Sequence, residues 1–221
     1  MNINKFPTTN KNFNQNRKML KYYFNRWSRD IREVIVYPLW YLRKANGADN
    51  HFYKRNRIHK LNIGRKYANF IETGTFYGQM VSAVHGHFNK ILSVELFDKL
   101  FFLNQSAFEN DKKVKIFHGD SASMLGEMID EVKDNILFWL DGHFSGQGTG
   151  IGIQASPIIY ELDIIEDKKL KNICILIDDV RLFTGEDGYP TLEQTTNKIK
   201  STYPNCNLYI DRDCLVAIIN Q

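Results

Sequence analysis

Hydrophobic positions divide the chain into a helical first part and a second part of short apolar runs. Between Arg17 and Leu42, apolar side chains recur at spacings of three and four, which predicts an amphipathic helix that Pro38 kinks or ends. The polar, asparagine-rich sequence up to about Asn12 is expected to be disordered. The segment 46–60 contains a glycine, asparagines and several basic residues, and we expect it to be a linker or lid.

Apolar runs appear from residue 66 onward and alternate with helical patterns. The runs cover 69–72, 90–95, 114–118, 136–140, 173–177, 207–210 and 214–219. Strands that alternate with helices indicate an α/β domain, and the last two runs are close enough together to predict a closing hairpin. The chain therefore divides into a helical extension and linker at 1–65 and a domain at 66–221.

A glycine-rich turn ends the first apolar run. The sequence there is Glu72-Thr73-Gly74-Thr75-Phe76-Tyr77-Gly78. Gly74 and Gly78 let the backbone turn tightly where a Cβ would obstruct a ligand. The spacing E-x-G-x-x-x-G differs from the dinucleotide motif G-x-G-x-x-G and from the lysine-bearing phosphate loop, so the ligand need not carry a phosphate.

This turn resembles the first motif of the class I S-adenosylmethionine (SAM) dependent methyltransferases, in which an acid and G-x-x-x-G follow the first strand. The resemblance covers roughly 66–221. It implies a Rossmann-like doubly wound sheet of order 3-2-1-4-5-7-6 with the last strand antiparallel. It also implies that SAM contacts Glu72, Thr73, Gly74, Thr75, Gly78, Glu95, Asp120, Ser121 and Asp141.

Two acids after the second and third runs match the nucleoside positions of that family. Glu95 follows Glu72 by 95 − 72 = 23 residues, where an acid accepts from the ribose hydroxyls. Asp120 matches the acid that accepts from the adenine amino group, with the Ser121 amide facing a ring nitrogen. Asp120 and Ser121 could instead cap the helix that begins at Ala122, and both roles are compatible.

Three aspartates follow the fourth and fifth runs. Asp141 ends one run and Asp178-Asp179 end the next, so the three carboxylates should converge at one edge of a parallel sheet. Crowded carboxylates repel one another unless a cation binds, and oxygen ligands suit Mg²⁺. The layout resembles the metal-dependent macrocin-type sugar O-methyltransferases. The residues Gly-His-Phe-Ser after Asp141 depart from the aspartate-rich sequence of those enzymes and leave the substrate open.

His143 is the candidate general base. It lies two residues after Asp141 in a glycine-rich loop, and imidazole titrates near neutral pH. A histidine hydrogen-bonded to the loop backbone is the alternative, since methyl transfer depends mainly on position.

Charge is distributed unevenly around a net value of +4. Residues 1–66 contain 16 Lys+Arg and 3 Asp+Glu, hence +13, and the remainder contains 13 and 22, hence −9. The extension could pack on the domain, form a homodimer, lie on an anionic membrane surface or bind nucleic acid. The absence of an N/D-P-P-Y/F motif disfavours nucleic acid. Without a membrane span, a secretory signal or paired cysteines, we expect a cytoplasmic protein.

The combined pattern predicts a SAM-dependent methyltransferase that O-methylates a sugar or other small hydroxylated metabolite with the help of Mg²⁺. One alternative is a metal-independent methyltransferase that acts on lipid or nucleic acid and is anchored by the basic extension. Another is a non-catalytic SAM-binding scaffold.

Overall fold

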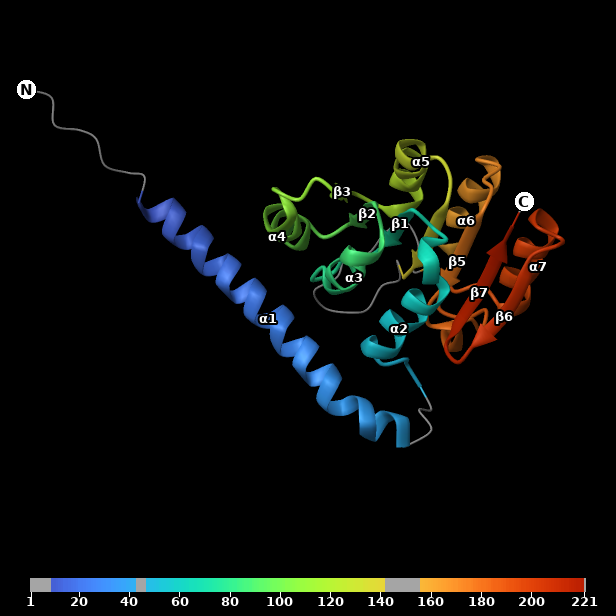
Figure 1. Ribbon diagram of the computed structural model, residues 1–221, viewed down its shortest axis with the longest axis horizontal. Helices are drawn as coiled ribbons and strands as arrows, with labels where there is room; N and C mark the ends of the chain where they lie inside the picture. Colours follow the sequence, from blue (N-terminus) through green and yellow to red (C-terminus); the bar gives the residue numbers. More distant parts are fainter. Residues whose placement is uncertain (1–8, 43–46, 142–155, 221) are drawn as a thin grey trace, which may run out of the picture.

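A seven-stranded sheet forms the centre of the protein (Figure 1). The computed structural model describes residues 9–42, 47–141 and 156–220. The strands are β1 (Asn69–Thr73), β2 (Lys90–Glu95), β3 (Val114–His118), β4 (Ile136–Leu140), β5 (Ile173–Ile177), β6 (Asn207–Asp211) and β7 (Cys214–Ile219). Their order is β3-β2-β1-β4-β5-β7-β6, and β7 is antiparallel to both of its neighbours. The expected Rossmann-like sheet, with its strand order and antiparallel last strand, is confirmed.

Helices cover both faces of the sheet. They are α1 (Thr9–Leu42), α2 (His51–Leu61), α3 (Gln79–Val84), α4 (Asp98–Phe108), α5 (Ser121–Val132), α6 (Ile158–Asp167) and α7 (Leu192–Thr202). Short 3-10 turns lie at Ile63–Arg65 (η1), His85–His87 (η2) and Val180–Leu182 (η3).

Alternate residues of the central strands belong to two separate apolar cores. Ile71 and Phe138 pack with side chains of α5, α6 and α7, whereas Phe70 and Trp139 pack with Ile58 of α2 and with α3. Burial on both faces explains why the central strands are continuous apolar runs rather than alternating ones. The carboxyl ends of β1, β2, β4 and β5 are left facing one crevice.

The expectation of a linker or lid at 46–60 is wrong over most of its length, because α2 begins at His51. The Asn50 side chain caps this helix by accepting the Phe52 amide at 2.9 Å. Ile58 is fully buried, and Arg57 is buried in ion pairs with Asp49 and Asp211. The buried side of α2 contains the ion-paired Arg57 as well as Ile58. Its sequence therefore lacks the regular apolar spacing from which an amphipathic helix is predicted.

Helix α1 is longer than the sequence pattern predicts. It begins at Thr9, so the expected disorder is wrong for 9–12, and it continues through Pro38 to Leu42. Because only one turn follows Pro38, the helix loses a backbone hydrogen bond there without ending. The helix runs along one side of the domain (Figure 1). No described helix combines the length and the apolar content needed to cross a bilayer.

Gly78→Ala tests how closely the glycine turn packs against α1 and α4. Gly78 has φ +67°, and an added Cβ would lie 2.7 Å from Asn104 Oδ1, 2.9 Å from Phe108 Cε2 and 3.1 Å from Tyr22 Oη. We expect the free energy of unfolding to fall by about 2 kcal/mol or more, because backbone strain adds to steric displacement. Urea denaturation measures the change.

Gly86→Ala is the matched control, since no heavy atom of the described residues outside its own turn lies within 4 Å of the Cβ it would add. Its stability should stay within about 0.5 kcal/mol of the native value. Equal losses in the two variants would contradict close packing at the turn.

Candidate active site

The glycine turn joins the carboxyl ends of β1 and β2. The amides of Gly74 and Thr75 both donate to the Val94 carbonyl, at 3.1 and 3.0 Å. Phe76 then adopts φ +50°, a left-handed conformation rare for a bulky residue, and its amide donates to Glu95 at 2.7 Å. Strained backbone of this kind costs of order 1 kcal/mol and concentrates at functional sites. The strained conformation directs the Phe76 amide toward Glu95, the acid predicted to bind the ribose.

Glu95 lies at the end of β2 with both carboxylate oxygens engaged. One oxygen accepts the Phe76 amide and the other accepts the Phe97 amide at 2.9 Å. Burial raises the pKa of Glu95, and these backbone amides act to lower it. A carboxylate has about four acceptor positions, so Glu95 can accept hydrogen bonds in addition to those from these amides. The ribose contact stays a prediction.

Glu72 lies beneath the turn. The Ser93 hydroxyl donates to Glu72 at 2.6 Å and lies 2.7 Å from the Thr75 hydroxyl. Burial raises the pKa of Glu72 well above its usual value, despite the hydrogen bond from Ser93. Glu72 is only 2% exposed, so the structure gives it a supporting position, and its predicted contact with SAM stays untested.

Asp120 and Ser121 begin α5. The Asp120 carboxylate accepts the Ala122 amide at 2.9 Å, which confirms the capping role, and Ser121 is buried. The adenine contact stays a prediction.

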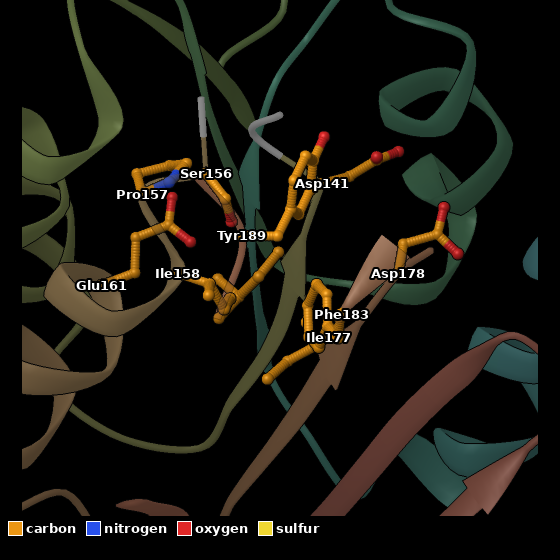
Figure 2. A pocket seen from close by; sticks show the side chains of 10 residues that line it. Asp141, Ser156, Pro157, Ile158, Glu161, Ile177, Asp178, Phe183 and Tyr189 are labelled. Atoms are coloured by element: carbon orange, nitrogen blue, oxygen red, sulfur yellow. The ribbon is translucent and has the colours of Figure 1, made fainter. Parts of the chain in front are cut away.

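The three predicted aspartates converge. Asp141, Asp178 and Asp179 each place a carboxylate oxygen so that all three oxygens lie within 4.8 Å of one another. The Asp141 amide donates to the Thr73 carbonyl at 3.2 Å, and the Asp178 amide donates to the Leu140 carbonyl at 3.1 Å. Backbone bonds between strands therefore fix the cluster at the carboxyl ends of β4 and β5. Figure 2 shows Asp141 and Asp178 at this edge.

Two cations not anticipated from the sequence reach this cluster. The Lys54 ammonium of α2 contacts Asp178 and lies 3.9 Å from Asp179, and the Arg181 guanidinium lies 2.5 Å from Asp179. Burial acts to lower the pKa of Lys54, but the three carboxylates outweigh it and raise the pKa. Lys54 therefore stays charged and compensates part of the cluster.

Glu161 of α6 is a second group that the sequence analysis missed. It is 1% exposed, and among the described residues its Oε1 has no hydrogen-bond partner. Burial raises the pKa of Glu161 to about 7, although the hydroxyls of Ser121 and Thr73 counteract this effect. Glu161 lines the same pocket as Asp141 and Asp178 (Figure 2). The sequence signal for this group was an acidic residue among the apolar positions of α6.

A charged cavity of about 230 Å³ lies next to the carboxylate cluster. Its walls come from α1, α2, α3 and the segment before α2, through Arg29, Arg32, Glu33, Asp49, His51, Lys54 and Gln79. Burial, and next the charge of Arg55, lower the pKa of His51 to about 4, so its imidazole is neutral at pH 7. The buried Nδ1 of His51 has no hydrogen-bond partner among the described residues. The predicted base His143 lies outside the described residues, as does the rest of 142–155.

Glu161→Gln tests the buried acid. The folded-state pKa is about 7 and the ordinary value is 4.5, so the unfolded chain releases this proton first as pH rises. The stabilising contribution of Glu161 is therefore full below pH 4.5 and is lost by about pH 7, a change of about 3 kcal/mol. The variant should lack this part of the pH dependence, measured by urea denaturation across a pH series.

Glu193→Gln, on the exposed surface of α7, is the control and should retain the native pH dependence. A native slope in Glu161→Gln would show that Glu161 is not the responsible group.

Comparison with known proteins identifies the fold. No protein-family model and no curated protein matches the sequence. Solved structures, in contrast, match the structure of this chain. An S-adenosylhomocysteine (SAH) bound methyltransferase of Podospora anserina, PaMTH1, is 14% identical, with 99% of each chain covered and a TM-score of 0.55.

Two further solved structures extend this likeness. A Bacillus cereus O-methyltransferase in complex with SAH is 11% identical, with 86% of this chain and 90% of that chain covered and a TM-score of 0.53. The O-methyltransferase TomG of Streptomyces achromogenes, in complex with SAM, is 10% identical, with 76% and 80% covered and a TM-score of 0.51. This chain therefore has the fold of methyltransferases solved with SAM or SAH bound.

Proposed function

We propose that this chain transfers the methyl group of SAM to a hydroxyl group of a sugar or another small hydroxylated metabolite, with Mg²⁺ assisting. The convergence of Asp141, Asp178 and Asp179 beside the glycine turn carries the proposal. In a fold shared with SAM-bound O-methyltransferases, this edge of the sheet is where a ligand crevice is expected.

The donor set fits a divalent cation. Three carboxylates supply the oxygen ligands that magnesium prefers, and Asp178 Oδ1 is buried without a hydrogen-bond partner among the described residues. Lys54 and Arg181 already contact two of these acids, so a metal ion would compete with Lys54 for Asp178. A bound magnesium ion would lower the pKa of the acceptor hydroxyl and orient its oxygen.

The chain itself supplies position and electrostatics. Methyl transfer is an in-line displacement, and its rate depends on holding the hydroxyl oxygen and the methyl group in register. The charged cavity between α1 and α2 reaches Lys54, so an acceptor there lies beside the carboxylates. The neutral His51 imidazole offers a buried hydrogen-bonding nitrogen to the acceptor. His143 stays the proposed general base.

A metal-independent methyltransferase acting on lipid is the second candidate. Lys54 favours it, because a resident ammonium already supplies positive charge where a metal ion would act. The two candidates differ in their response to chelator.

Calorimetric titration with SAH tests the cofactor site. We expect micromolar binding that Glu95→Ala weakens at least about tenfold, or about 1.4 kcal/mol, because the ribose loses its acceptor. His51→Leu changes the acceptor cavity, so it should keep SAH affinity and lose turnover, measured as SAH release with a panel of sugars and catechols. Absence of SAH binding by the native chain would refute the proposal.

Magnesium titration of Lys54→Met tests the metal site. Removing the ammonium should lower the free energy of unfolding in chelator by about 3 kcal/mol, because Asp178 is left buried and uncompensated. Mg²⁺ should raise the free energy of unfolding more in this variant than in the native chain. In Asp179→Asn, the heat of Mg²⁺ binding measured by calorimetry should disappear.

Lys60→Met, at an exposed position of the same helix, is the matched control and should behave as the native chain. Unchanged methyl transfer by chelator-treated native protein would favour the metal-independent candidate.

A further inference from the structure

Helix α1 contacts the domain through a largely polar face. The Tyr22 hydroxyl lies 2.8 Å from the Tyr77 carbonyl oxygen and 2.6 Å from Asn104 Oδ1, and these two acceptors share its single proton. The α1 residues that contact the rest of the chain recur at helical spacing and are Tyr22, Arg26, Arg29, Asp30, Glu33, Tyr37 and Trp40. One face of the helix is thereby attached to the domain.

The opposite face of α1 is apolar and exposed. Its large side chains are Leu20, Phe24, Trp27, Ile31, Val34, Ile35, Leu39 and Leu42, a set we call the outer stripe. Ile31 lies nine positions after Tyr22, which places it about 180° away around the helix. Leu20, Ile35 and Leu42 are 70%, 67% and 76% exposed.

This arrangement reverses the usual polarity of a helix on a globular domain, where the apolar stripe faces the core. The outer stripe extends over about 33 Å at 1.5 Å per residue, and no other described element covers it (Figure 1). A continuous exposed apolar surface of this extent marks an interaction site.

Charge indicates what covers the outer stripe. The two acids of α1 both face the domain, where Asp30 accepts from Gln79 at 3.1 Å and Glu33 accepts the His51 amide at 3.1 Å. Lys21 is exposed beside the stripe, about 80° from its centre, whereas Arg32, also exposed, lines the charged cavity on the other side. The outward-facing side of α1 that the structure describes is therefore apolar and cationic, without an acid.

We propose that the outer stripe of α1 binds the surface of an anionic lipid bilayer, with the helix lying parallel to it. Apolar side chains enter the boundary between headgroups and acyl chains, and Lys21 meets anionic headgroups. Trp27 and Tyr41 are of the types that concentrate at that boundary. A second copy of the chain offers no acid on this face, so pairing two outer stripes would bring cations together.

Sedimentation of the full chain with lipid vesicles tests the proposal. Vesicles of phosphatidylcholine with phosphatidylserine should bind the chain, vesicles of phosphatidylcholine alone should bind it weakly, and added salt should reduce binding. Ile31→Asp combined with Ile35→Asp should weaken binding at least about tenfold, because two apolar side chains that would enter the bilayer become charged. Circular dichroism and SAH binding would establish that the variant is folded.

Ile63→Asp is the matched control. Ile63 is 69% exposed, close to the 67% of Ile35, but lies outside α1, so this variant should bind vesicles as the native chain does. The tryptophan emission of the native chain should shift to shorter wavelength on binding, and Trp27→Phe should lose that shift.

Two results would overturn the proposal. One is equal loss of binding in Ile63→Asp and in the α1 variant. The other is a native chain that ignores both vesicle types but forms a dimer by light scattering, which Ile31→Asp with Ile35→Asp converts to a monomer. That result would assign the outer stripe to a second copy.

Discussion

Compensation of buried negative charge at the carboxyl edge of the sheet is the constraint on which the rest of the structure depends. Asp141, Asp178 and Asp179 meet there, with Glu161 in the same pocket. An unpaired buried carboxylate costs several kcal/mol, so cations must reach the crevice from elsewhere in the chain. Lys54 reaches it from α2.

A second cation reaches the same edge from η3. Arg181 contacts both Asp179 and Asp213, so it ties the cluster to the turn between β6 and β7. The Arg57 side chain of α2 also pairs with Asp211 at the end of β6. One electrostatic requirement therefore attaches the N-terminal helices and the C-terminal hairpin to the same edge of the sheet.

The sequence was sufficient for the features that follow general rules of parallel sheets. The strands were recognisable because burial on both faces demands continuous apolar runs, and the meeting of Asp141 with Asp178 and Asp179 follows from strand order. Lys54 could not be predicted, because it lies 124 positions from Asp178 on a helix without an apolar period. The hydrogen bond from the Phe76 amide to Glu95 depends on a left-handed backbone conformation at Phe76. Phenylalanine rarely adopts this conformation, so the sequence does not predict it.

The position of β7 has a consequence for synthesis of the chain. β7 is last in sequence but lies between β5 and β6, so β6 has no strand to pair with until β7 leaves the ribosome. The partner of Arg181 at Asp213 and the start of β7 at Cys214 are adjacent, and both emerge late. Until then the nascent domain carries an open sheet edge, and Arg181 lacks the Asp213 carboxylate that helps to hold it beside Asp179. Completion of the sheet and the placement of Arg181 beside the crevice therefore depend on the same few residues, so a ligand that needs the finished crevice has to wait until β7 has been added.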